Sequence, residues 1–187
     1  MRLKSSSYLL LGMLRLGATS GYSIKKAADA STHFFWPTSL AQVYPELAAL
    51  ERQGLVSRRD DSHGARTRSA YTLTPAGEEA LLEWLRSERE APIQFRDEGL
   101  LRLFFADALP LEERLALVRR LRERNRNATA FMEGVGLGGA KTLESRDLRF
   151  PAIAARFGAE LWAFTEDWTA RLEAELEAEA EAERDPQ

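Results

Sequence analysis

Residues 39–54 decide the fold of this chain, and they read SLAQVYPELAALERQG. Apolar side chains recur in this stretch at spacings of three and four residues, which predicts a helix with one buried stripe. The apolar positions are Leu40, Val43, Leu47 and Leu50. Ser39 and Gln42 fit the S-x-x-Q capping box, and Gly54 is a favourable C-terminal stop. Pro45 removes one backbone hydrogen bond, yet the stripe passes it in phase, so we expect a single helix.

The flanking sequence predicts the elements on either side of this helix. Two shorter helices are expected before it, at residues 7–16 and 22–30, where apolar residues recur with helical spacing. After it, residues 55–60 and 68–73 predict two strands joined by a polar turn. Residues 74–75, Thr-Pro, then supply a cap and a first-position proline for another helix. The order helix, helix, helix, hairpin, helix is that of a winged helix-turn-helix.

The chain beyond residue 90 is predicted to change to longer helices. They are expected at residues 97–107, 111–132 and 151–183, with a glycine-rich break at 134–139. The last helix carries an apolar stripe that needs a partner surface, formed by Phe157, Leu161, Phe164, Trp168 and Leu172. We therefore expect a mainly α-helical protein. A winged helix-turn-helix DNA-binding domain with a two-stranded wing fills residues 1–90, and a helical dimerisation domain with an acidic C-terminal end fills residues 91–187.

The composition argues against several classes of function. Without cysteine, the chain has no disulfide and no thiolate metal site, and two histidines are too few for a histidine-rich zinc site. We therefore expect no metal and no cofactor. No nucleophile–base constellation stands out, so we expect no enzyme. The apolar run at residues 8–11 is too short for a membrane span, which favours a cytoplasmic protein that does not enter the membrane.

The net charge of −3 hides an asymmetry along the chain. Residues 1–73 hold ten Lys/Arg against five Asp/Glu, whereas residues 74–187 hold sixteen against twenty-four. A basic front half and an acidic back half indicate that only the front half meets a polyanion such as DNA. Chance unevenness is the alternative explanation, and charge alone does not decide between the two.

The polar face of the helix at residues 39–54 holds side chains suited to reading DNA. The third helix of a winged helix-turn-helix enters the major groove. With the apolar stripe buried, Ser39, Gln42 and Glu46 are predicted to face outward, with Tyr44 on the flank. Glutamine can contact adenine through two hydrogen bonds, and serine and tyrosine suit phosphates or base edges. A purely capping role is the alternative; we favour it for Ser39 and favour groove contact for Gln42.

Two basic clusters extend this predicted surface. Lys25 and Lys26, on the second helix, can clamp the DNA backbone, and Arg66 and Arg68 stand at the far side of the wing turn. Two aspartates at residues 60–61 partly oppose the wing arginines. An ordinary solvated basic face is the alternative for each cluster, and it is disfavoured because the clusters fall on one predicted surface.

The first 85 residues resemble the PadR family of transcriptional regulators. The resemblance is carried by LLG at residues 10–12, GYSIKK at 21–26, FWP at 35–37, QVYPEL at 42–47 and YTLTPAG at 71–77. It implies a homodimer, joined through its C-terminal helices, that represses or less often activates transcription at operator DNA. It also implies that Tyr22, Ser39, Gln42, Tyr44, Arg66 and Arg68 lie against DNA. The wing departs from the Gly-Arg-Pro-Arg pattern of the family, because GARTR stands at residues 64–68.

The favoured function is therefore a sequence-specific regulator, in particular a repressor acting as a homodimer on a pseudo-palindromic operator. A small aromatic effector could bind an aromatic pocket near the dimer interface, although ordinary packing is the favoured explanation of these residues. They are Trp84, Phe95, Phe104, Phe105, Phe131, Trp162 and Trp168. Two other functions stay open: a winged module that binds another protein, and a protein that sequesters a small molecule.

Overall fold

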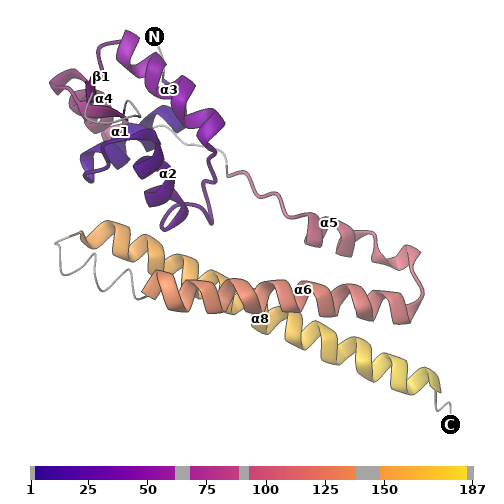
Figure 1. Cartoon of the computed structure of the whole chain (residues 1–187). Coiled ribbons are helices and arrows are strands. Elements are labelled where there is room, and N and C mark those ends of the chain that lie inside the picture. The colour runs from indigo at the N-terminus through magenta and orange to yellow at the C-terminus, as the bar shows by residue number, and fades with distance from the viewer. Residues whose placement is uncertain (1–2, 62–67, 89–92, 138–147, 185–187) are drawn as a thin grey trace. The chain divides into compact units, whose positions relative to one another are not determined.

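The structure of the chain is a computed structural model with two compact units, Met1–Ala91 and Pro92–Gln187. The residues that it describes are 3–61, 68–88, 93–137 and 148–184. Most of them are helical, and the two strands pair in one small sheet of the first unit. Figure 1 shows the ribbon of both units. The predicted class, mainly α with a two-stranded wing, is confirmed.

The first unit has the element order of a winged helix-turn-helix (Figure 1). Its elements are α1 (Ser5–Arg15), α2 (Gly21–Asp29), α3 (Leu40–Arg52), β1 (Val56–Asp61), β2 (Arg68–Leu73) and α4 (Pro75–Arg86). The Thr74 hydroxyl caps α4 by accepting a hydrogen bond of 3.1 Å from the Gly77 N–H, and Pro75 is the first helical residue. The start of α4 therefore forms as its sequence predicts.

The core of the first unit forms where α1, α2 and α3 pack together. Its most deeply buried side chains come from all three helices: Leu10, Leu11, Ile24, Val43, Leu47 and Leu50. Helix α3 continues unbroken through Pro45. The predicted stripe is correct at three of its four positions but wrong at Leu40, which is 38% exposed. Leu40 is the first residue of α3, one turn ahead of Val43, so it precedes the packed part of the helix.

The wing is an antiparallel pair in which Val56 faces Leu73 at the base and Asp61 faces Arg68 at the outer end. Val56 and Tyr71 are buried and join the wing to the helical core. The Tyr71 N–H donates a hydrogen bond of 2.8 Å to the carbonyl of Thr19, in the loop before α2. The base of the wing is thus held against the helix-turn-helix. The turn predicted at residues 61–65 lies, apart from Asp61, outside the described residues.

The second unit is built on two long helices (Figure 1). Its elements are α5 (Glu98–Phe104), the 3-10 turn η1 (Ala106–Ala108), α6 (Leu111–Phe131), the π-helical turn η2 (Met132–Leu137) and α8 (Arg149–Arg184). The helix predicted at residues 97–107 is shorter than expected, because Asp97 is its N-cap and the chain tightens into η1 after Phe104. Residues 134–137 of the predicted break continue the helix as η2, and the rest of that break lies outside the described residues.

Helix α8 buries small and polar side chains, whereas α6 buries mainly leucine and valine. The buried residues of α8 are Ala152, Gly158, Ala159, Thr169, Glu173 and Ala180. The Asn125 side chain of α6, 2% exposed, donates a hydrogen bond of 3.2 Å to the carbonyl of Thr165 on α8. Glu173 accepts from Arg122 (Nη1–Oε2, 2.8 Å) and Arg119 (Nε–Oε1, 3.0 Å) of α6, and these bonds lower the pKa of its carboxyl. These polar contacts fix how α8 lies along α6.

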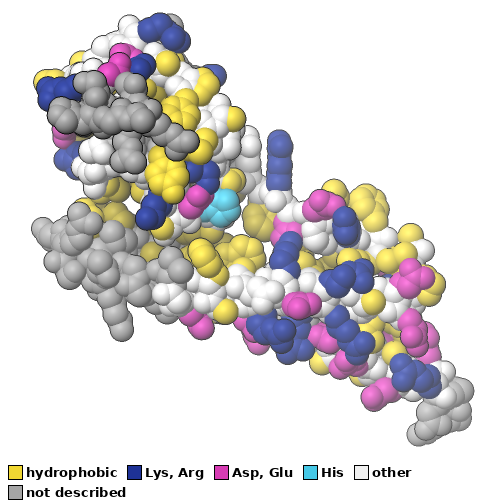
Figure 2. Space-filling model, in the orientation of Figure 1, with side chains coloured by type: hydrophobic (Ala, Val, Ile, Leu, Met, Phe, Trp, Pro, Cys, Tyr) yellow, Lys and Arg dark blue, Asp and Glu magenta, His cyan; other side chains and the backbone are white. Residues whose placement is uncertain are grey.

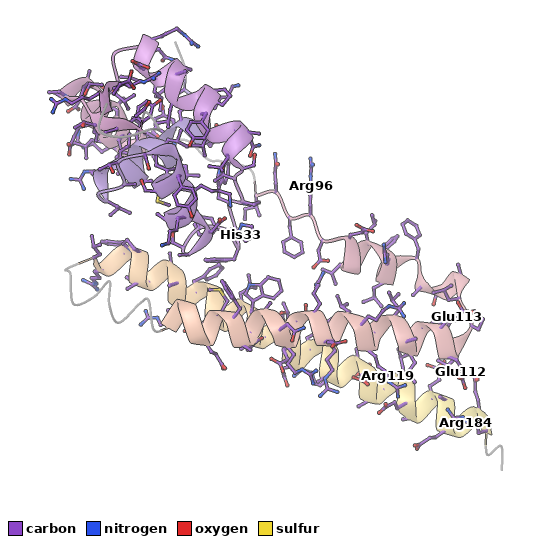
Figure 3. All side chains as sticks on the ribbon, viewed as in Figure 1. His33, Arg96, Glu112, Glu113, Arg119 and Arg184 are labelled. Carbon is purple, nitrogen blue, oxygen red and sulfur yellow. The ribbon has the colours of Figure 1, made fainter. Side chains whose placement is uncertain are left out.

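Charged side chains of both signs are interspersed along α6 and the C-terminal part of α8 (Figure 2). Arg119 also binds Glu177, with 2.6 Å between Nη2 and Oε1. At the C-terminal end of α8, Arg184 lies beside Glu112 of α6, with 3.9 Å between Nη2 and Oε1 (Figure 3). Among the described residues, no helix is both long and apolar enough to cross a membrane.

Candidate nucleic-acid interface and the exposed stripe of α8

The start of α2 is fixed by a capping box and presents Tyr22 to solvent. The Ser20 hydroxyl accepts from the Ser23 N–H (3.1 Å), and the Ser23 hydroxyl accepts from the Ser20 N–H (2.8 Å). Tyr22, the second residue of the helix, is 66% exposed. Because the backbone is held on both sides of it, Tyr22 projects from a fixed point at the start of α2.

The two lysines of α2 have different environments. Lys26 is exposed, and no ion pair involves it among the described residues. Lys25 is half-buried and forms an ion pair with Asp29 one turn later. Asp29 also lies 3.6 Å from the Nδ1 atom of His33. The predicted lysine clamp is therefore available from Lys26, whereas Lys25 must leave Asp29 to bind a phosphate.

The start of α3 is capped by Gln42 itself. The Gln42 side-chain oxygen accepts hydrogen bonds from the Ser39 N–H (3.0 Å) and the Ser39 hydroxyl (3.2 Å). Both side chains are exposed. We predicted capping for Ser39 and groove contact for Gln42, but the two residues share the cap. The Gln42 amide nitrogen is the part of its side chain that these bonds leave for a partner.

Beyond this cap, the side chains of Tyr44 and Glu46 point to different neighbours. Tyr44 is 48% exposed, and its ring packs against the backbone of Gly21 at the start of α2. Glu46 accepts a hydrogen bond from the hydroxyl of Ser7, a buried residue of α1. The prediction that Glu46 faces outward is therefore wrong, because Ser7 draws its carboxylate toward α1. This hydrogen bond draws the negative charge of Glu46 away from the exposed side chains of Gln42 and Tyr44.

The described part of the wing carries one arginine that is already paired. The Arg58 guanidinium donates to the Asp60 carboxylate (Nε–Oδ1, 2.8 Å), which also accepts from the Ser69 hydroxyl (2.8 Å). These two bonds, the one from Ser69 first, lower the pKa of the Asp60 carboxyl. Arg66 lies outside the described residues, and Arg68 is described only through the backbone of β2. Their predicted contacts with DNA stay predictions.

The stripe predicted on the last helix lies on the face of α8 that turns away from α6. Phe157 and Phe164 are each 60% exposed, and Trp168 is also exposed. Leu161 and Leu172, between and beyond them, are half-buried. Phe150 and Ile153 extend the exposed apolar surface toward the start of α8. The large side chains of this helix thus lie opposite the small and polar residues that it buries against α6.

The aromatic residues considered for an effector pocket are mostly exposed in the described chain. Trp84 of α4 stacks on Tyr8 of α1, with 4.7 Å between ring centroids and 6° between planes. Phe104 and Phe105 form an edge-to-face pair at 5.0 Å. The more exposed members of the set are Phe95, Phe104, Phe105 and Phe131, each with over half of its surface open to solvent. These four do not line an enclosed pocket within the described single chain.

Two residues that organise this site were missed by sequence reasoning. The sequence patterns mark Ser7 only as the start of the first predicted helix and Gly21 only as the first residue of the GYSIKK motif. Nothing near Ser7 in the sequence points to Glu46, which is 39 residues away along the chain. Gly21 does stand directly before an exposed tyrosine, and that adjacency is a weak signal of a close approach by another side chain.

The first unit is thus a winged helix-turn-helix in which the exposed ends of α2 and α3 meet. A model of the PadR-like family of transcriptional regulators matches residues 10–83. The negative transcriptional regulator PadR of Bacillus subtilis is 30% identical over 128 residues, which cover 68% of this chain and 70% of that protein. This chain therefore belongs to the PadR-like family.

Solved structures of the Bacillus subtilis protein share the fold over most of this chain. The complex of that protein with operator DNA superposes with a TM-score of 0.80 at 23% identity, covering 94% of this chain and 99% of the other. Its complex with p-coumaric acid gives a TM-score of 0.72 at 24% identity, covering 93% and 99%. At this identity the superpositions establish the fold, including the helical region after the winged unit.

Proposed function

We propose that this chain is a sequence-specific DNA-binding repressor that acts as a homodimer. The proposal rests on the two faces of α3, one buried and one exposed, in a chain that belongs to a family of transcriptional regulators. One face of the helix is locked into the core by Val43, Leu47 and Leu50, while Gln42 and Tyr44 stay exposed. A rigid helix with a short exposed polar face suits insertion into a major groove.

In this proposal Gln42 reads a base through its amide nitrogen. That nitrogen can donate to an acceptor on a base edge, such as N7 of a purine, while the oxygen keeps its two bonds to Ser39. A two-bond contact with adenine would require the oxygen to leave Ser39. Releasing those bonds costs about 0.5–1.5 kcal/mol each. We therefore expect one hydrogen bond from Gln42 to a base, with Tyr22, Ser39, Tyr44 and Lys26 binding phosphates or base edges.

Residues 91–187 serve in this proposal as the dimerisation domain and residues 1–90 as the DNA-binding domain. Helix α8 has 36 residues, a length of about 54 Å. It carries its large apolar side chains on the face away from α6, and a second copy of the chain would remove that face from water. A dimer of this kind presents two α3 helices to successive major grooves, about 34 Å apart on a pseudo-palindromic site.

The Bacillus subtilis relative, solved in one complex with operator DNA and in another with p-coumaric acid, supports an effector for this chain as well. We propose a small aromatic acid that binds the dimer and lowers its affinity for the operator. Phe104, Phe105 and Phe131 are apolar surfaces that such a ring could stack on once a second copy encloses them. An operator-binding function also calls for a cytoplasmic location, where the chromosome is accessible.

The proposal is tested by comparing two glutamines of the same helix. Gln42 stands at the start of α3, and Gln53, also exposed, is the C-cap at its other end. On a duplex selected by the wild-type protein from a random pool, Gln42→Ala should weaken binding about fivefold, the loss of one hydrogen bond. On a scrambled duplex it should change little, and Gln53→Ala should change neither. Equal losses for Gln42→Ala on both duplexes would show that Gln42 contacts no base.

The proposed wing contact has a different signature. Arg66→Ala should weaken binding to the selected and the scrambled duplex alike and should lower the slope of log affinity against log salt by about one, because a phosphate contact carries no sequence information. Arg59→Ala is the matched control for Arg66→Ala, because Arg59 is an exposed arginine of β1 within the described part of the wing. An unchanged salt slope in Arg66→Ala would remove this residue from the interface.

A further inference from the structure

The first residue of α2 is a glycine that the backbone does not require. Among the described glycines only Gly17 and Gly54 have a positive φ, so Gly21 has a conformation that any residue can adopt. Inside a helix, alanine is favoured over glycine by about 0.5–1 kcal/mol. The helix start at this point is set by the Ser20 capping box rather than by the glycine. The reason for a glycine here must therefore lie outside the helix.

That reason is the ring of Tyr44. A Cβ atom at Gly21 would lie 2.6 Å from Cε1, 2.9 Å from Cζ and 3.1 Å from Cδ1 of Tyr44, and these are its three nearest heavy atoms. The first two distances are shorter than any stable carbon–carbon contact, since such pairs are optimal at about 3.5–4.0 Å. Gly21 is itself buried, while Tyr44 is half-exposed. One edge of the ring therefore rests on the bare backbone of α2, and the rest of the ring reaches solvent.

We propose that Gly21 is a positioning residue for DNA binding, because its missing side chain makes the seat that holds the Tyr44 ring. The inference rests on the proposed function, in which α3 contacts DNA. The seat joins the second and third helices of the helix-turn-helix through an exposed aromatic side chain. Tyr22, the residue that follows Gly21, is exposed as well. The junction of α2 and α3 thus holds two exposed tyrosines.

The seat matters for binding more than for folding. A half-exposed ring that loses its seat can swing into solvent, so the core is not disturbed. The DNA partner then has to order a side chain that the free protein no longer holds in place, and that ordering costs affinity. A side chain at position 21 should therefore leave the chain folded but weaken its binding to DNA.

The placement of the ring can be measured without DNA. The chain has four tyrosines, so protein labelled with 3-fluorotyrosine should give four fluorine resonances, and Tyr44→Phe assigns one of them. In Gly21→Ala the Tyr44 resonance should move, while those of Tyr8 and Tyr71 keep their positions. Gly12→Ala is the matched control, since Gly12 is a helical glycine of α1 whose added Cβ would meet nothing within 4 Å. A Tyr44 resonance unchanged in Gly21→Ala would overturn the seat.

The effect on binding is tested by a double-mutant cycle on the selected duplex. Gly21→Ala should lower the affinity about fivefold in the wild-type chain, the size of one lost hydrogen bond, and not at all in a Tyr44→Ala chain. The same fivefold loss in both backgrounds would show that Gly21 acts by another route and would overturn the proposal. A wild-type chain that binds no duplex would sink the proposed function and with it the DNA role of Gly21. The fluorine spectra would still report whether the ring rests on this residue.

Discussion

The two units of the chain differ in how far they bury their large apolar side chains. The N-terminal unit buries large aliphatic residues such as Leu11, Leu47 and Leu50 completely. The C-terminal unit buries aliphatic residues of α6 such as Val118, but its longest helix, α8, buries small and polar residues, while Phe157 and Phe164 stay exposed. Burial of apolar surface is the main favourable contribution to folding, so the first unit has the means of its own stability. In the second unit, large apolar side chains of α8 are exposed, and only another protein surface can cover them.

This difference indicates how the two units divide the work. A self-contained core holds α3 rigid, which suits the reading of bases proposed for it. An incompletely covered pair of helices is suited to association, because its exposed aromatic residues can become the centre of an interface. The following variants test this contrast, from the largest expected effect to the smallest.

The largest effect is expected in the core of the first unit. Leu47→Ala removes a fully buried side chain of α3 and should lower the free energy of unfolding by about 2–5 kcal/mol. Leu85→Ala, at a leucine of α4 that is 64% exposed, is the control and should stay within about 0.5 kcal/mol of wild type. Urea unfolding at one fixed protein concentration measures both. Similar losses in the two variants would mean that the first unit has no self-contained core.

A smaller effect, on association, is expected on the exposed stripe. Phe164→Ser should weaken the proposed dimer by about 2 kcal/mol, roughly thirtyfold, as for an aromatic residue at the centre of an interface. Its helix content should not change, because the side chain is exposed within the single chain. Sedimentation equilibrium measures the dissociation constant.

The control for this variant is Arg156→Ser, at an exposed residue about 100° around α8 from Phe157. It should leave the dimer unchanged. If Phe164→Ser sediments as wild type does, the stripe is not the dimer contact, and another partner must cover it.

The hydrogen bond from the buried side-chain amide of Asn125 on α6 to α8 should contribute about 1–3 kcal/mol to the free energy of unfolding. Asn125→Ala leaves the carbonyl of Thr165 without the hydrogen bond that it accepts across the two helices. Asn127→Ala is the matched control, because Asn127 is an exposed asparagine of the same helix. Urea unfolding should separate the two variants. If they unfold alike, the buried amide does not stabilise the helix pair.

The smallest effect is expected where α5 meets α6. Arg124 binds both carboxylate oxygens of Asp97, at 2.6 and 2.7 Å, and this hydrogen bonding lowers the pKa of the carboxyl. A lowered pKa stabilises the folded chain above the ordinary value of 3.8, and the contribution is lost as the pH falls through the folded value. Asp97→Asn should therefore cost about 0.5–1 kcal/mol at pH 7, since the pair is partly exposed.

The difference in stability between Asp97→Asn and wild type should shrink as the pH falls below the ordinary value of 3.8, because the Asp97 carboxyl of the unfolded chain then binds a proton more readily than that of the folded chain. Urea unfolding between pH 7 and pH 3 measures this difference. A gap that stays constant over the whole range would assign the effect to the cap of α5 rather than to the charge of Asp97.

Local sequence patterns predicted most of the first unit. The stripe of residues 39–54, its capping box and the Thr-Pro start of α4 each depend on residues at most a few positions apart, and each forms as expected apart from Leu40. The second strand of the wing has its predicted bounds, and the first is displaced by one residue, from 55–60 to Val56–Asp61. These features are set by backbone geometry and local burial, which a short window of sequence records.

The remainder depends on contacts between distant residues. Glu46 was placed on the outer face by helical spacing alone, but a hydroxyl from α1 draws it inward. Asn125 and Thr169 are polar, so a sequence pattern assigns them to the surface, and only the packing of α6 on α8 buries them. Gly21 and Tyr44 meet across two helices. In each case the deciding neighbour lies more than twenty residues away along the chain.

The central claim, that α3 belongs to a sequence-specific DNA-binding unit, is tested most directly by fluorescence anisotropy of the full chain. The measurement compares a duplex selected from a random pool with a scrambled duplex of the same composition, across a series of salt concentrations. Our account predicts saturable binding to both, with the selected duplex bound at least about a thousandfold more tightly and both affinities falling as salt rises. Equal affinity for the two duplexes at every salt concentration, or no binding to either at low salt, would contradict it.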